Sequence, residues 1–551
     1  MNRLRILSSL LRKTHRSSCS FSVSRRPITN AFYSSLSGKP KFSYHNGSGG
    51  YSWNLHHPQL WIIFSGQAAI LGLSTNPVLA DDLPIEPNSR GETNEASMTG
   101  LEKVEDGSVV SNIHTSKWRV FTDNGRDYFL QGKLDQAEKF FCSAIQEAKE
   151  GFGERDPHVA SACNNLAELY RVKKDFDKAE PLYLEALSIL EQSYGPEDVR
   201  VGATLHNLGQ FYLVQRKLAE ARSCYERALK IKRRVLGQSN PDYADTMYHL
   251  GTVLHLQGKE TDAEALILDS LKILEEDGLE ESLTYIRRSR YLSQIYLKSN
   301  HLAEAENIQR KLLHTLELSK GWKSMETVNA AEALALTLQS TGQLRDALDL
   351  FERCLDSRKT LLPETHIQIG GNLLHIARTL TLRASRSRKA DITEALSELD
   401  KAKKCLEQSI RIAKDFLHKL KKQKGKEQKL GKSKDENAAL VILLQSFESL
   451  ALLEMNKNQI QETKEEHPEA AEDALFQCIS TFKEFGTGTH AGDSPEVKSA
   501  YLSCLKHLQA LLADKSSQDS TNSKAQSDVS LQDLRNEIRR IEKELVALQR
   551  R

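Results

Sequence analysis

The sequence predicts an all-α protein, a right-handed α-solenoid of helix–turn–helix units. The first observation is its composition, with 551 residues, 27% charged side chains and only 13 prolines, which is typical of helices with solvated faces. The second is a column of small residues that recurs every 42 positions, at Gly125, Ala167, Gly209, Gly251, Ser293, Ala335 and Ala377. The third is a column of alanines twelve positions further on, at Ala137, Ala179, Ala221, Ala263, Ala305 and Ala347.

A fixed period of this length indicates that each unit is one supersecondary element, which buries its apolar face only against its neighbours. Within a unit, the spacing of the two columns fits two antiparallel helices. Small residues let helix backbones approach closely, while larger neighbours such as Leu208, Tyr212 and Tyr225 fill the adjoining gaps. We therefore expect the column alanines to face a neighbouring helix.

The turns between units carry their own signals. They read FGERDPHVA, YGPEDVRVG and LGQSNPDYA, and they place Gly153, Gly195 and Gly237 at the same spacing. Glycine ends a helix, and proline with aspartate or asparagine starts the next one. We expect a helix end at each glycine and a helix start shortly after it.

This pattern resembles the tetratricopeptide repeat (TPR), in its longer, kinesin-light-chain-like form of 42 residues. The resemblance runs from Trp118 to Leu512, within a predicted solenoid of about eight repeats over 115–512. Three places depart from the pattern. Gln309 stands where an aromatic residue is expected, the alanine of the seventh unit comes late, at Ala402, and a Lys-rich loop is expected at 417–436.

The resemblance also implies a binding surface, because the first helices of such repeats line a concave groove that takes peptides or partner helices. Asparagine can hold a peptide backbone from both sides, and Arg or Lys would favour acidic side chains or a terminal carboxylate. The predicted groove residues are Arg126, Asn164, Asn165, Arg171, Asn207, Gln210, His249, His255, Arg290, Gln294, Lys298, His375 and Arg378.

The N-terminal region has the composition of a targeting sequence. Residues 1–80 hold nine Lys or Arg and no acidic residue. Residues 1–35 resemble a mitochondrial presequence, with chloroplast import as the alternative. In the linker 36–114, which we expect to be disordered, the apolar segment 60–80 is a second sorting signal or a membrane anchor, although its apolar run is short for a bilayer.

The C-terminal end predicts a short coiled-coil helix at 530–551, after a flexible linker at 513–529. Its apolar residues are spaced alternately three and four apart, at Leu531, Leu534, Ile538, Ile541, Leu545 and Leu548. Three uses stay open for this helix: self-association into a homo-oligomer, docking onto a partner, or folding back on the solenoid.

No motif for catalysis stands out, so we expect no enzyme, no cofactor and no metal. The Gly-Lys stretch at 425–433 has the wrong spacing for a phosphate loop. The eight cysteines are scattered without a paired-cysteine motif, which favours free structural thiols. Since the net charge is +2 and residues 1–80 contribute nine positive charges, the rest of the chain is acidic, at −7, which argues against nucleic acid as a partner.

The functional hypothesis is a non-enzymatic scaffold in an organelle, most simply the mitochondrion. It would bind a protein partner in its groove, and a role in complex assembly would fit. The alternatives are a cytoplasmic cargo adaptor related to kinesin light chain and an RNA-binding helical-repeat factor. RNA binding is disfavoured by the acidic body and by the absence of the shorter repeats that read one base each.

Overall fold

The computed structural model describes residues 113–387, 391–423, 431–461, 469–518 and 524–549. Every regular element in this described part is a helix, which confirms the all-α prediction. The described chain forms two compact units, 113–319 and 320–549, and each is considered by itself. The predicted presequence 1–35 and the segment 60–80 lie outside the described residues.

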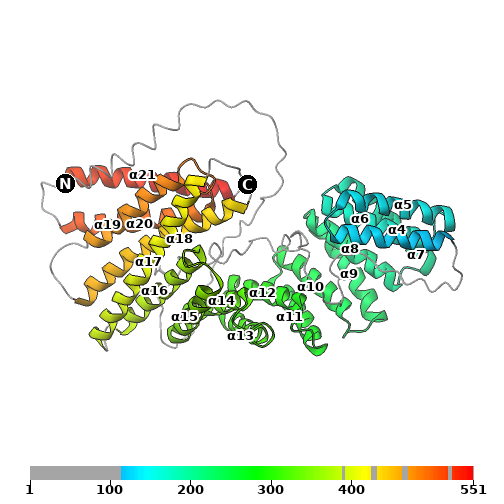
Figure 1. The fold of residues 1–551 in the computed structure, drawn as a ribbon, viewed down its shortest axis with the longest axis horizontal. Helices are drawn as coiled ribbons and strands as arrows, with labels where there is room; N and C mark the ends of the chain where they lie inside the picture. Colours follow the sequence, from blue (N-terminus) through cyan, green and yellow to red (C-terminus); the bar gives the residue numbers. More distant parts are fainter. Residues whose placement is uncertain (1–112, 388–390, 424–430, 462–468, 519–523, 550–551) are drawn as a thin grey trace, which may run out of the picture. The chain divides into compact units, whose positions relative to one another are not determined.

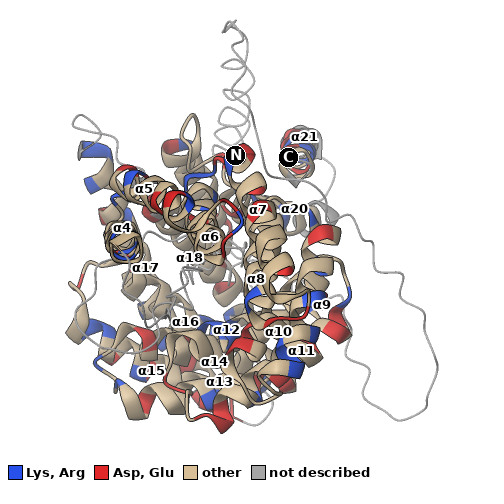
Figure 2. Ribbon diagram, turned by 90° about the vertical axis from the view of Figure 1, so that its right-hand side faces the viewer, with Lys and Arg blue, Asp and Glu red and all other residues tan. Residues whose placement is uncertain are grey.

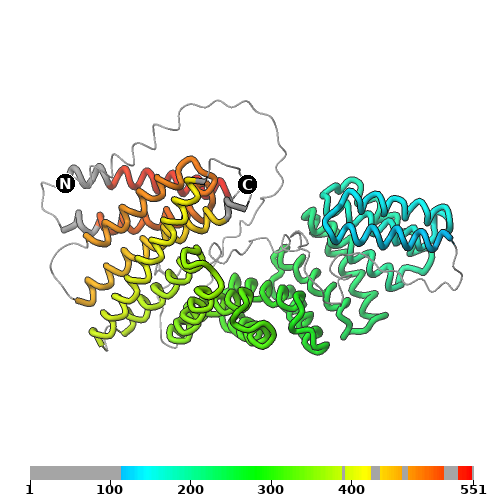
Figure 3. Tube along the Cα trace, viewed as in Figure 1, coloured from blue at the N-terminus to red at the C-terminus, as the bar shows by residue number. Residues whose placement is uncertain are grey.

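The first unit is a run of five antiparallel helix pairs (Figure 1). In chain order, the helices are α4 (Ile113–Leu130), α5 (Leu134–Phe152), α6 (Pro157–Lys173), α7 (Phe176–Tyr194), α8 (Val199–Val214), α9 (Leu218–Val235), α10 (Pro241–Leu256), α11 (Glu260–Glu276), α12 (Leu283–Lys298) and α13 (Leu302–Ser319). Even-numbered helices are the first helix of a repeat and odd-numbered helices the second. Each packs on the next along the chain, as the tube in Figure 3 makes easy to follow.

The column of alanines is buried as predicted. All six, from Ala137 to Ala347, have 0% exposed surface. At each glycine of the small-residue column, a large side chain of the second helix lies against the first helix. A Cβ atom added to Gly209 would lie 2.9 Å from Cε1 of Tyr225, and one added to Gly125 would lie 2.5 Å from Cε1 of Phe141. These columns therefore stay small because a neighbouring side chain occupies the space.

The helix ends also follow the period. Gly153, Gly195 and Gly237 end their helices or follow the last residue closely, each with positive φ. Three residues after each glycine, Asp156, Asp198 and Asn240 accept a hydrogen bond from a backbone N–H of the first turn of the next helix. Such caps satisfy amide groups that have no partner within the helix. The expected start and stop signals are confirmed.

Charges of both signs are interspersed along the helices (Figure 2). Many pair within one helix, one turn apart, as do Arg222 with Glu226 at 2.6 Å and Arg310 with Glu306 at 2.8 Å. Such exposed pairs contribute little to stability. Interspersed charges of this kind are typical of solvent-exposed helix faces.

The second unit begins with helices of ordinary length and continues with much longer ones. It contains α14 (Met325–Thr341), α15 (Leu344–Leu361), α16 (Ile367–Ser387), α17 (Ile392–Gln423), α18 (Gly431–Gln461), α19 (Glu469–Thr481), the π-helical turn η2 (Phe482–Gly486), α20 (Pro495–Gln518) and α21 (Lys524–Gln549). Ala402 is fully buried on α17, so the late alanine of the seventh repeat keeps its packing role.

Two predicted irregular segments are largely helical instead. Residues 417–423 of the expected Lys-rich loop 417–436 continue α17 and residues 431–436 belong to α18, whereas residues 424–430 lie outside the described residues. Of the linker expected at 513–529, residues 513–518 belong to α20 and residues 524–529 to α21, whereas residues 519–523 lie outside the described residues. Lysine and glutamine are good helix formers, and long helices here extend the array beyond what the polar composition suggested.

The C-terminal helix α21 packs on its own chain. Leu531, Leu534, Ile538 and Ile541 are buried in the core of the second unit, together with residues of α18, α19 and α20. Helix α20 therefore pairs with α21 as a further antiparallel couple. Folding back, one of the three uses left open by the sequence, is the arrangement seen, and the apolar seam needs no second chain to cover it.

The expectation that all cysteines are free thiols is wrong for one pair. Cys478 on α19 and Cys504 on α20 form a disulfide, 26 residues apart in sequence. No sequence motif predicts this disulfide, because the two cysteines meet only when the helices pack side by side. Five other cysteines in the described part are free.

Helix α18 is the central helix of this core. Its stretch Asp435–Gln461 is long and apolar enough to cross a membrane, but 72% of the most apolar window is buried inside the protein. A buried core helix meets the same length and composition test. The apolar composition of α18 is thus explained by packing.

Candidate functional site

The predicted groove residues divide into buried and half-exposed groups. Eleven of them lie in the first unit, and His375 and Arg378 lie in the second. In the first unit, three of the four buried members, Asn164, Asn207 and His249, belong to a chain of polar contacts that joins successive first helices. We call this chain the polar ladder and define it as Asn164, His206, Asn207, Gln210, Asp245, His249 and Arg288.

The asparagines are interior residues. Asn164 and Asn165 have 1% and 0% of their surface exposed, and Asn207 has 5%. The amide nitrogen of Asn207 donates to Oδ1 of Asn164 at 3.3 Å, which links α8 to α6. The role of the three asparagines in peptide binding stays a prediction, but in this structure the amides of Asn164 and Asn207 serve a contact between repeats, and all three present almost no surface to a partner.

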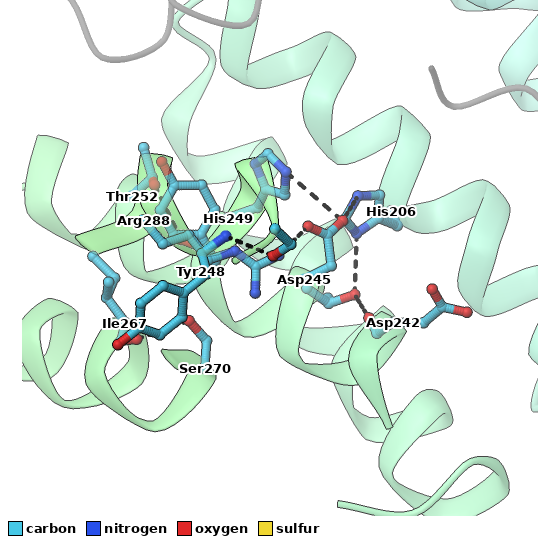
Figure 4. Close-up of polar contacts among 12 residues, drawn as sticks. His206, Asp242, Asp245, Tyr248, His249, Thr252, Ile267, Ser270 and Arg288 are labelled. Carbon is cyan, nitrogen blue, oxygen red and sulfur yellow. Dashed lines mark hydrogen bonds and ion pairs between the residues drawn. The ribbon is translucent and has the colours of Figure 1, made fainter. Parts of the chain in front are cut away.

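The centre of the polar ladder lies between α8 and α10 (Figure 4). His206 comes from α8, and Asp245 and His249 lie one turn apart on α10. Nε2 of His206 lies 3.2 Å from Oδ2 of Asp245, and Nε2 of His249 lies 3.9 Å from the same oxygen. Nε2 of Gln210 lies 3.1 Å from His206 and 3.3 Å from His249.

Arg288 completes this cluster from α12. Its Nη2 lies 2.5 Å from Oδ1 of Asp245, and its guanidinium lies over the ring of Tyr248. The side chain is almost fully buried, so a charged residue lies inside the array with a carboxylate partner. Buried charges are tolerated when they are paired in this way.

The electrostatics follow from this pairing. Burial acts to raise the pKa of Asp245, but His249, His206 and Arg288 together hold it well below its usual value. Burial lowers the pKa of His206, Lys232 and Arg288 act in the same direction, and Asp245 opposes them. The expected state near neutral pH is an ionised Asp245 beside a neutral His206.

Other predicted residues reach the surface. Arg126, Arg171, Gln210, His255, Arg290 and Gln294 are half-buried, and Lys298 is exposed at the end of α12. Arg171 donates to Oε2 of Glu168 at 3.0 Å, and Arg126 lies 3.6 Å from Asp123. Burial lowers the pKa of His255, whose ring stands edge-on to Tyr291.

In the second unit, His375 repeats an arrangement found in the first. Its ring stacks on Phe351 at 5.3 Å, as that of His249 stacks on Tyr225 at 5.7 Å. Burial lowers the pKa of His375 to about 4. Arg378, on the same helix, donates to the hydroxyl of Ser449 at 3.0 Å.

Sequence reasoning missed the charged members of these networks. Asp245 and Arg288 were not predicted, nor was the buried pair in which Arg358 contacts both carboxylate oxygens of Glu332, at 2.5 and 2.7 Å. A signal was present in the sequence. Arg288 and Arg358 occupy positions whose counterparts in the 42-residue pattern are buried (Thr246 and Ala330, Leu274 and Leu316), and a charge there requires a partner.

Comparisons with known proteins agree with this description. A tetratricopeptide-repeat family model matches residues 119–192, 159–213 and 200–276, and a second such model matches 327–368. None of the curated proteins gives a significant match.

The similar solved structures have low sequence identity to this chain. BtubC (BKLC) from P. vanneervenii is 17% identical, with a TM-score of 0.35 over 46% of this chain and 93% of that one. The repeats of a putative kinesin light chain from Podosopora anserina are 18% identical, with a TM-score of 0.34 over 37% and 98%. The apo form of RapI is 12% identical, with a TM-score of 0.41 over 72% and 97%. The family models match in both compact units, so this chain contains tetratricopeptide repeats over 119–276 and 327–368.

Proposed function

We propose that this protein is a non-enzymatic scaffold that holds a protein partner on the first helices of its repeats. Tetratricopeptide repeats in general mediate contacts between proteins. One observation carries the proposal for this chain. Every first helix of the first unit, from α4 to α12, presents at least one polar or cationic predicted residue that is not buried.

The chemistry of this surface favours an acidic partner. Arg126, Arg171, Arg290 and Lys298 are all cationic, and guanidinium groups bind carboxylates with two parallel hydrogen bonds. An acidic peptide segment or a terminal carboxylate is the kind of ligand that such a surface attracts. The buried asparagines would then act indirectly, by keeping successive first helices in register.

Charge reversal on α12 tests the surface. We would compare the full chain carrying Arg290→Glu and Lys298→Glu with a matched control, Lys230→Glu and Lys272→Glu, on the second helices α9 and α11. Both variants change the net charge by the same amount. Quantitative mass spectrometry of co-purified proteins should show partners lost from the first variant and kept by the control, and identical partner lists would contradict the proposal.

We further propose that the scaffold works in the mitochondrion, with the chloroplast as the alternative. The acid-free segment 1–35 and the apolar segment 60–80 support import and a second sorting step. The Cys478–Cys504 disulfide supports an oxidising compartment, such as the space between two organelle membranes, because reducing compartments keep thiols free. Where the mature chain begins would decide whether 60–80 is removed or stays as an anchor.

Localisation is tested with a C-terminal fluorescent fusion of the full chain and by sequencing the N-terminus of the native protein. Organelle fluorescence and a mature N-terminus beyond residue 35 are expected. Fluorescence along microtubules with an intact N-terminus would instead favour the cytoplasmic cargo adaptor. Alkylation before reduction, followed by peptide mass spectrometry, should find Cys478 and Cys504 protected.

A further inference from the structure

The cluster between α8 and α10 combines three groups that bind metal ions. The ring nitrogens of His206 and His249 and a carboxylate oxygen of Asp245 all lie within 4.8 Å of one another. The two histidines are buried and Asp245 is half-buried, so the cluster is largely shielded from water. Figure 4 shows these side chains turned toward each other.

The hydrogen bonds around His206 determine which of its nitrogens is available. The hydroxyl of Thr246 donates to the backbone carbonyl of Asp242 at 3.0 Å. When its single proton is used there, the Thr246 oxygen accepts from Nδ1 of His206, also at 3.0 Å. In the neutral ring, Nε2 then carries the lone pair. Metal-binding histidines are commonly oriented by a hydrogen bond of this kind on the other nitrogen.

This tautomer leaves two acceptors facing each other. Nε2 of His206 lies 3.2 Å from Oδ2 of Asp245, and in this tautomer neither atom carries a proton, whereas in the other tautomer Nε2 donates to Oδ2. The second carboxylate oxygen, Oδ1, is held by Arg288, so Oδ2 is the one directed at the histidines. Either a proton or a cation between the two atoms would turn this repulsion into attraction.

The position of Gln210 marks the common point of the two rings. Its amide nitrogen lies 3.1 and 3.3 Å from the Nε2 atoms of His206 and His249, so both lone pairs are directed at one place. In the metal-free protein the amide donates to both rings. Turning the amide over would present its oxygen at the same place as a fourth ligand.

We propose that His206, Asp245 and His249 bind a divalent transition metal, Zn²⁺ in particular, with Gln210 or water as the fourth ligand. Two imidazoles and one carboxylate form a common zinc ligand set, whereas Mg²⁺ and Ca²⁺ prefer oxygen ligands. With bonds of about 2.0–2.2 Å, tetrahedral ligand atoms lie roughly 3.3 Å apart. The His206–Asp245 pair already has this spacing, and His249 would move closer to Asp245.

The bound metal would join the first helices of the third and fourth repeats. Asp245 and His249 are separated by one helical turn, so both ligands come from one face of α10, while His206 comes from α8. The metal would therefore stiffen the junction between two repeats. This departs from the expectation of no metal, which rested on the absence of a recognisable ligand motif in the sequence.

The test is metal titration of the full chain after chelator treatment. Calorimetry with ZnCl₂ should find one site that is lost, or weakened at least tenfold, in His249→Gln and in Asp245→Asn. Co²⁺ should give the visible absorption of a four-coordinate ion in the parent protein and not in these variants. The matched control is His314→Gln, which changes an exposed histidine on α13 and should leave both signals unchanged.

Two outcomes would overturn the proposal. One is the absence of a stoichiometric Zn²⁺ site in the parent chain. The other is equal binding by the parent, His249→Gln and Asp245→Asn, which would assign the ion to other histidines or thiols. Circular dichroism melting without metal distinguishes a lost ligand from a lost fold, and Asp245→Asn keeps the side-chain volume if His249→Gln does not fold. A further variant, Thr246→Val, should weaken Zn²⁺ binding without removing it, since Thr246 only orients His206.

Discussion

The third and fifth repeats meet the same packing requirement with different chemistry. In the third, Gly209 on the first helix leaves space that the ring of Tyr225 fills from the second helix. In the fifth, the corresponding residues are Ser293 and Gln309, and the Gln309 amide donates to the Ser293 hydroxyl at 2.8 Å. The departure at Gln309 is thus half of a matched pair. The position requires complementary volume, and either an apolar or a polar pair can provide it.

The sixth repeat extends this comparison from polar to ionic contacts. There Ala335 and Phe351 keep the apolar arrangement, and next to them Arg358 and Glu332 form a fully buried ion pair. Arg358→Leu should therefore have the largest effect, because it leaves the Glu332 carboxylate buried without its partner. We expect a loss of about 3–5 kcal/mol in the free energy of unfolding, measured by urea denaturation.

The control for this change is Lys359→Leu, an exposed neighbour, which should alter stability by less than about 0.5 kcal/mol. The double variant Arg358→Leu with Glu332→Leu should recover most of the loss, since no charge then stays buried. A single variant as stable as the parent would mean that this pair is not buried in solution.

His375, whose ring stacks on Phe351 of the sixth repeat, makes the free energy of unfolding depend on pH. His375 has a pKa of about 4 in the folded chain, below the ordinary value of 6.5, because it is buried. The unfolded chain therefore binds more protons between these values, and stability is lost as the pH falls. Between about pH 7.5 and pH 5 we expect His375 to cost roughly 2 kcal/mol.

The measurement compares urea denaturation of the parent and His375→Phe at both pH values. Phenylalanine keeps the stacking on Phe351 but cannot bind a proton, so the variant should lose less stability on acidification. Carboxylates titrate alike in the two proteins and cancel in the difference. The same loss in both proteins would assign the pH dependence to groups other than His375.

The apolar packing of the third repeat, where Tyr225 lies against Gly209, is tested by substituting Gly209. Alanine normally stabilises a helix by about 1 kcal/mol relative to glycine. At Gly209 the new methyl group would meet Tyr225 within about 3 Å, so we expect Gly209→Ala to destabilise by about 1–2 kcal/mol instead.

Gly370 supplies the matched control, because its nearest neighbour, Ile412, would lie at an ordinary 3.5 Å from the added Cβ atom. Gly370→Ala should therefore raise the melting temperature, whereas Gly209→Ala lowers it. If both substitutions shift the melting temperature in the same direction, close packing is not the reason for Gly209.

The smallest expected effect comes from exchanging the polar pair of the fifth repeat for the glycine–tyrosine pair of the third, and it tests the comparison of the two repeats most directly. Gln309→Tyr alone should clash with Ser293, and Ser293→Gly alone should leave the buried Gln309 amide without its acceptor. The double variant recreates the glycine–tyrosine pair of the third repeat. We expect it to be about 1 kcal/mol more stable than the sum of the two single changes predicts. Strict additivity in thermal unfolding would show that the two positions do not act as a pair.

Much of the array could be predicted because its determinants are local and periodic. The alanine column, the glycine column and the caps at Asp156, Asp198 and Asn240 each repeat at one spacing, and each acts within one helix pair or one turn. The polar residues were harder to place. Asn165 and Lys298 were predicted for the same surface, yet one is buried and the other exposed, because burial depends on how far the next repeat covers a helix.

The sequence by itself therefore determined the helix pairs, their period and the residues that must stay small. Only the tertiary structure decided that His206, Asp245 and Arg288 meet across three repeats, that Cys478 bonds to Cys504, and that α21 covers its own core. The physical reason is distance along the chain. Contacts within a repeat follow from helix geometry and spacing, whereas contacts between repeats depend on the angle at which whole helices pack, which no short motif encodes.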